Sequence, residues 1–77
     1  MNGKFWAILE IQRDQRGVIS SIVHANDNEA EAQSSFYGIC AAAAISPLPY
    51  HAALLINDSG DIEMMRIFDR REKEEKA

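Results

Sequence analysis

Few side chains in this sequence are of a type that could carry out chemistry, and they are scattered along it. The only imidazoles belong to His24 and His51, and the only thiol belongs to Cys40. A metal site would need both histidines together with carboxylates such as Asp27 or Glu29. We predict that the two histidines lie at opposite ends of a sheet, on the order of 15–20 Å apart at ~3.3 Å per strand residue. The sequence therefore predicts no metal site within one chain, while a site across a dimer interface stays open.

The remaining candidate motifs fit structural roles better than catalytic ones. Residues 57–61 with Glu63 offer oxygen ligands as a calcium loop does, but strand-like flanks and the wrong spacing indicate a hairpin turn. Cys40 lies on the apolar stripe of a predicted helix, which is typical of a small core residue. No nucleophile elbow surrounds Ser20–Ser21 or Ser34–Ser35, and no glycine-rich phosphate loop is present. We therefore predict no catalytic residue, no cofactor and no enzymatic activity.

The composition indicates a small soluble domain. The chain has 77 residues, of which 47% are hydrophobic and 26% charged, as in ordinary globular domains. No segment approaches the roughly 18 consecutive apolar residues of a membrane span, and the first residues do not form a secretory signal. The net charge of −4 disfavours binding to the phosphates of a nucleic acid. We predict a cytoplasmic protein with neither a membrane nor a nucleic acid as its partner.

Strand and turn signals predict a β-hairpin on each side of one helix. Turn residues at 14–17 and 57–60 separate segments of alternating or β-branched residues. Asn26 with Glu29, or Asn28 with Glu31, fits a capping box at the start of the helix. The predicted elements are, in chain order, strands 5–13 and 18–25, a helix within 26–45, and strands 50–57 and 62–69. The fold class is therefore α+β (ββαββ), with a four-stranded sheet and one helix packed on one face. Residues 1–69 form one domain, and 70–77 form a charged tail predicted to be disordered.

Apolar residues occur on both faces of the predicted strands, whereas one helix can cover only one face. The helix stripe that contains Ala32 and Phe36 should lie on the sheet. We assign Trp6 and Ile8 to the face that points away from the helix. Because a large exposed apolar face is abnormal for a monomer, we predict a homodimer, with a different protein partner as the alternative. The predicted interface residues are Trp6, Ile8 and Ile22 from the sheet and Tyr37 and Ala41 from a weaker apolar strip of the helix.

The helix and the second hairpin share a series of features with other small proteins. The pair Phe36–Tyr37 is followed by small residues, then by a strand that His51 opens, the turn at 57–60 and a last strand that contains a glutamate. In these features residues 30–69 resemble a group of small bacterial and prophage-associated proteins of unknown function. The resemblance implies two hairpins around one helix and an origin in a mobile element. It implies no reaction and transfers no functional residue.

We predict that the protein is a small non-catalytic interaction module that self-associates through the sheet face not covered by the helix. One alternative is a phage-type regulator or inhibitor of a host protein, whose acidic surface would mimic DNA. The other is a small-molecule-binding domain. That alternative requires a cleft lined by two or more of the few suitable polar side chains, which are His24, His51, Tyr37 and Tyr50.

Overall fold

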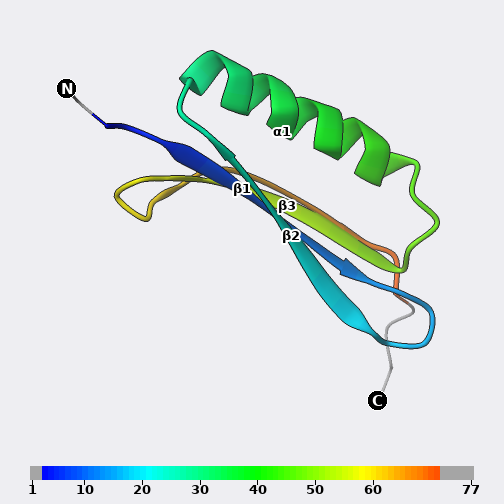
Figure 1. Ribbon diagram of the computed structural model, residues 1–77. Helices are drawn as coiled ribbons and strands as arrows, with labels where there is room; N and C mark the ends of the chain where they lie inside the picture. Colours follow the sequence, from blue (N-terminus) through cyan, green and yellow to red (C-terminus); the bar gives the residue numbers. More distant parts are fainter. Residues whose placement is uncertain (1–2, 72–77) are drawn as a thin grey trace.

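The computed structural model describes residues 3–71 and has the predicted order of hairpin, helix and hairpin (Figure 1). Its elements are β1 (Trp6–Arg13), β2 (Ile19–Asn26), α1 (Glu29–Ala44), β3 (Tyr50–Asn57) and β4 (Ile62–Asp69). The strands form one antiparallel sheet in the order β2-β1-β3-β4, so β1 and β3 are central and β2 and β4 are edges. Since α1 crosses one face of this sheet, the α+β prediction is confirmed.

Both hairpin turns are held by a side chain at their first residue. The Oδ1 atom of Asp14 accepts two backbone N–H groups of the first turn at 2.9 Å. The Oδ1 atom of Asn57 does the same in the second turn at 3.0 Å. Gly17 and Gly60 follow with φ of 86° and 89°, a backbone conformation that glycine adopts without strain. The predicted turn at 57–60 is therefore confirmed.

The start of α1 is capped by the side chain of the residue that precedes it. The side chain of Asn28 accepts the backbone N–H of Glu31 at 2.9 Å. Glu29 and Glu31 lie in the first turn, where their charge favours the positive end of the helix dipole. Asn28 is therefore the N-cap residue, whereas its own backbone N–H donates to Oδ1 of Asn26 at 3.3 Å and not to Glu31 as in a capping box.

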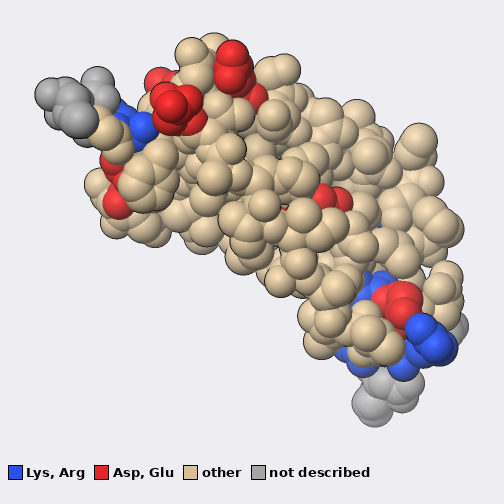
Figure 2. Space-filling view, viewed as in Figure 1, with Lys and Arg blue, Asp and Glu red and all other residues tan. Residues whose placement is uncertain are grey.

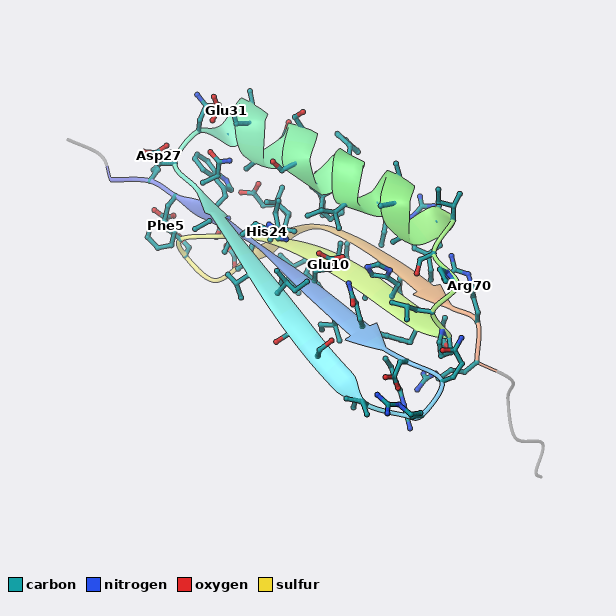
Figure 3. All side chains as sticks on the ribbon, turned by 45° about the vertical axis from the view of Figure 1, so that its right-hand side comes forward. Phe5, Glu10, His24, Asp27, Glu31 and Arg70 are labelled. Carbon is teal, nitrogen blue, oxygen red and sulfur yellow. The ribbon has the colours of Figure 1, made fainter. Side chains whose placement is uncertain are left out.

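The end of α1 is capped by a distant residue, because its last turn holds no basic side chain. Arg70 donates from Nη2 to the carbonyl oxygens of Ala43 at 2.6 Å and Ala44 at 2.9 Å (Figure 3). Arg71 pairs with Asp69 at 2.8 Å. The sequence analysis placed both arginines in the tail, but they belong to the folded part. The rest of the predicted tail, 72–77, lies outside the described residues.

We expect Arg70→Ala to destabilise the domain by about 1–2 kcal/mol, since it removes charge-assisted hydrogen bonds to helix-end carbonyls. Urea denaturation followed by circular dichroism measures the change. Arg71→Ala is the matched control, because its exposed pair with Asp69 contributes little. Equal losses of stability in the two variants would contradict the capping role of Arg70.

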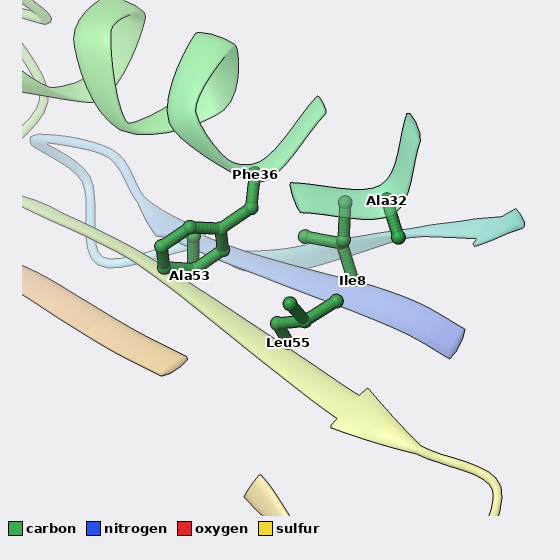
Figure 4. Close-up of a cluster of buried hydrophobic side chains, with 5 residues drawn as sticks. All are labelled: Ile8, Ala32, Phe36, Ala53 and Leu55. Atoms are coloured by element: carbon green, nitrogen blue, oxygen red, sulfur yellow. The ribbon is translucent and has the colours of Figure 1, made fainter. Parts of the chain in front are cut away.

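The core lies between α1 and the two central strands. Ile8 of β1, Phe36 of α1 and Leu55 of β3 are the largest fully buried side chains. Ala32 and Ala53 complete the cluster, and Phe36 points from α1 towards Ala53 (Figure 4). The small alanines let the helix approach the sheet closely. The predicted packing of the helix stripe on the sheet is therefore confirmed at Ala32 and Phe36.

The faces of β1 are reversed relative to the prediction. Ile8 is in the core beneath α1, and Trp6 packs against the same cluster. Because side chains alternate along a strand, the open face instead receives Leu9 and Ile11. The first residues of β1 are apolar on both faces, so alternation alone could not orient the strand, and the polar Glu10 made its face look solvated.

Candidate functional site

The sheet face that α1 leaves uncovered is almost wholly apolar. We call it the open face. The register pairs Leu9 with Val23 and Leu54, and Leu54 with Met65, so these four side chains lie in one row across all strands. The neighbouring rows add further branched residues. The large apolar members of the open face are Leu9 and Ile11 of β1, Ile19 and Val23 of β2, Leu54 and Ile56 of β3, and Ile62, Met65 and Ile67 of β4.

The open face is exposed most strongly on the two edge strands. Ile19 and Val23 on β2 are 66% and 65% exposed, and Met65 and Ile67 on β4 are 53% and 47% exposed. Within the described strands, charged residues occupy open-face positions only at one end, in the register row that holds Arg13 and Asp69. Four strands about 4.8 Å apart and ~26 Å long present on the order of 500 Å². A patch of this size matches the largest apolar patch of a typical monomer, and such patches are often functional.

A polar cluster lies on the opposite face, beneath α1 (Figure 3). The carboxylate of Glu10 accepts a hydrogen bond from Nε2 of His51 at 2.6 Å, one from Nε2 of His24 at 3.3 Å and one from the amide of Gln12 at 3.1 Å. Glu10 and His51 are buried, at 9% and 5% exposed. We call these four residues the Glu10 cluster; they join three strands of the sheet.

The two histidines are about as far apart along the sheet as predicted, but both imidazoles reach the carboxylate of Glu10, which the prediction did not foresee. His24 pairs with Ile8 and His51 with Gln12, so along the strands the two histidines are offset by four residues. Glu10 lies between them on the central strand, and each imidazole reaches it along a diagonal of ~7–8 Å. His51 is also buried, at the second position of β3.

The electrostatics of the Glu10 cluster follow from its burial. Burial by itself raises the pKa of Glu10, but the hydrogen bonds from His51, Gln12 and His24 together outweigh it, and the pKa is lowered. Because a carboxylate only accepts, Nε2 of His51 carries the hydrogen. The other ring nitrogen, Nδ1, is buried without a partner among the described residues. Residues 3–71 contain no group of three His, Cys, Asp or Glu side chains that could hold a metal ion.

Two hollows lie elsewhere on the surface. A groove of 560 Å³ between α1 and β4 is lined mainly by apolar side chains, with Arg66 as its one charged residue. Cys40 lines it, and burial raises the pKa of this thiol despite the nearby Arg66. A smaller hollow of 230 Å³ lies at the Arg13 end of the open face. Neither contains two of the four polar side chains that the small-molecule alternative requires.

The five predicted interface residues do not form one surface. Ile8 is buried in the core, and Trp6 is half-buried with its indole N–H donated to Glu63 at 3.4 Å. Ile22 is 44% exposed but lies on the α1 side, because it pairs with Glu10. Tyr37 and Ala41 are exposed and line the groove between α1 and β4. The residues that sequence reasoning missed are those of the open face, whose signal was the other alternating set of each strand.

No family model, curated protein or solved structure matches this chain. The resemblance of residues 30–69 to small prophage-associated proteins stays a prediction. Within the described residues, no helix combines the length and apolarity needed to cross a membrane.

Proposed function

We propose that this protein is a small interaction module that self-associates through its open face. The observation that carries the proposal is the difference between the two faces of one sheet. Within residues 3–71, one face is covered by α1 and holds the core, whereas the other has nine large apolar side chains and no helix over it. The hydrophobic effect favours covering that second face as it favours covering the first.

The area of the open face supports a reversible dimer. Two such faces together bury on the order of 1,000 Å², which is at the lower end of specific protein interfaces. Full burial of one Val, Leu, Ile or Met side chain contributes about 1.5–3 kcal/mol, and those of the edge strands are still half to two-thirds exposed.

A second copy of the chain is the partner that this surface fits. A two-fold dimer buries the same patch on both subunits, so the patch must be complementary to itself. This apolar sheet face meets that condition, because the described strands present no charge at its centre that would oppose a second copy. Face-to-face packing of two sheets is also a common way of building a core.

We expect Val23→Lys to weaken the dimer by at least about tenfold, since it would bury an unpaired ammonium in the interface. Light scattering and sedimentation velocity over a concentration series measure the change. Ile22→Lys is the matched control: it makes the same substitution one residue earlier in β2, on the opposite face.

The wild-type protein and Ile22→Lys should therefore both dimerise, whereas Val23→Lys should be monomeric at the same concentration. A folded wild-type protein that stays monomeric up to millimolar concentration would overturn the proposal. Equal weakening by the two substitutions would show that the dimer does not use the open face.

A further inference from the structure

Most charged side chains visible in Figure 2 gather at the two ends of the molecule, with one acidic patch between them. The start of α1 and the β3–β4 turn lie at one end, which we call the acidic end. Among residues 3–71 it holds six carboxylates and one lysine, a formal charge of −5. These residues are Asp27, Glu29, Glu31, Asp58, Asp61, Glu63 and Lys4.

The other end, which we call the basic end, holds the β1–β2 turn and the last residues of β4. It has four arginines and two aspartates among residues 3–71, a formal charge of +2. These residues are Arg13, Arg16, Arg70, Arg71, Asp14 and Asp69. Each subunit is therefore electrically polar along the direction of its strands.

A symmetric dimer of open faces with aligned strands can be built in two ways. The two-fold axis must lie in the plane between the sheets. An axis that runs along the strands places like ends together, acidic over acidic. An axis that runs across the strands reverses each strand and places the acidic end of one copy over the basic end of the other.

We propose that two copies of this chain pack open face to open face about an axis across the strands, with opposite ends together. This inference rests on the proposed self-association. Packed sheets are separated by ~10 Å, close to the screening length of ~8–10 Å at physiological ionic strength, so the charges of the turns and strand ends still interact. Glu29 and Glu31 on α1, and Arg70 against its last turn, lie farther from the second copy and contribute less. Like ends would set the two acidic ends against each other, whereas opposite ends set each acidic end against a basic end.

The proposed arrangement fixes which residues face each other. The axis crosses every strand near its midpoint, so each strand lies over its own copy. Val23 is near the middle of β2 and Met65 near the middle of β4, and both are on the open face. In the proposed dimer Val23 therefore faces Val23 of the second copy, and Met65 faces Met65. With the axis along the strands, β2 would lie over β4, and Val23 would face Met65.

Thiol cross-linking distinguishes the two arrangements. In a Cys40→Ser background, Val23→Cys and Met65→Cys are treated with a short bis-maleimide, each alone and in a one-to-one mixture with different mass tags. We expect each variant to cross-link to itself and no product that joins the two tags. Ile22→Cys, on the α1 side, is the control that should not cross-link.

A product found only in the mixture would overturn the proposed arrangement and leave self-association intact. A light-scattering dimer without any of these products would show that the open face is not the interface. A folded monomer would overturn self-association itself. The failures of the two proposals are thus distinguishable.

Whether a charge reversal strengthens or weakens the dimer also distinguishes the two arrangements. Arg13→Glu reverses a charge at the open-face end of β1. With opposite ends together, it should weaken the dimer roughly threefold to tenfold at low ionic strength, and less in high salt. With like ends together, the same substitution would relieve repulsion between basic ends and tighten the dimer. Tighter association of Arg13→Glu would therefore overturn the proposed arrangement.

Discussion

Replacement of His51 by leucine is expected to destabilise the domain by about 3 kcal/mol, because removal of one partner leaves the other half of a buried pair poorly compensated. Glu10 would keep only its bonds to Gln12 and His24 in a site where it is 9% exposed. A domain of this size rarely gains more than ~3–5 kcal/mol from its core, so a large fraction of the variant should be unfolded. Urea denaturation, or loss of far-ultraviolet ellipticity, measures this.

A double-mutant cycle separates the hydrogen bond between Glu10 and His51 from simple loss of packing. Glu10→Leu with His51→Leu replaces both partners by apolar side chains, and we expect the double variant to be more stable than His51→Leu alone. His24→Leu is the matched single control, since this imidazole is 3.3 Å from Glu10 and its side chain is 43% exposed. If the stability lost in the double variant equals the sum of the losses in the two single variants, Glu10 and His51 are not coupled. The interpretation of the Glu10 cluster would then be wrong.

The pH dependence of stability provides a second check on the same pair. Because the pKa of Glu10 is lowered in the folded state, its contribution is complete above the ordinary value of 4.5 and is lost as the pH falls through the folded value. Glu10→Gln should remove this component, so its stability should fall less steeply than that of the wild-type protein below pH 4.5.

The elements of the fold could be predicted from the sequence because their signals are local. The turns at Asp14 and Asn57 and the cap at Asn28 each involve residues within a few positions of one another. Alternating or β-branched segments between turn residues placed all four strands, since these signals need no knowledge of distant residues. The confirmed ββαββ order therefore rests on short-range chemistry.

The positions that sequence reasoning misjudged depend on contacts between distant residues. Glu10 looks like a solvent-facing residue until His51, a residue 41 positions later, supplies its hydrogen bond. Without that pairing, the face of β1 that carries Trp6 and Ile8 was assigned to the side away from the helix. Arg70 was placed in the tail for the same reason, because its acceptors lie on α1, 26 and 27 residues away. Strand order and register determine these contacts, and neither can be predicted from the residue pattern of a single short segment.

Phe36→Ala is expected to cost about 3–5 kcal/mol, which is the usual loss for a buried phenylalanine. The side chain is 2% exposed and is one of the three largest in the core. Tyr37→Ala is the matched control, since Tyr37 is the next residue of the same helix and is 59% exposed. Thermal or urea unfolding of dilute samples should show Phe36→Ala largely unfolded and Tyr37→Ala nearly as stable as the wild-type protein. Similar stabilities of the two variants would contradict the position of the core.

The Phe36→Ala variant also connects folding to self-association. If only the folded chain dimerises, mass action stabilises it as the protein concentration rises. The variant should therefore regain helical signal on concentration, and Val23→Lys added to Phe36→Ala should abolish that recovery, whereas Ile22→Lys should not. The core beneath α1 and the open face are opposite sides of one sheet. The stability that Phe36→Ala removes from the core should therefore be compensated by the apolar area that the open face buries in the dimer. Recovery that persists with Val23→Lys would show that the compensating contact lies on a different surface.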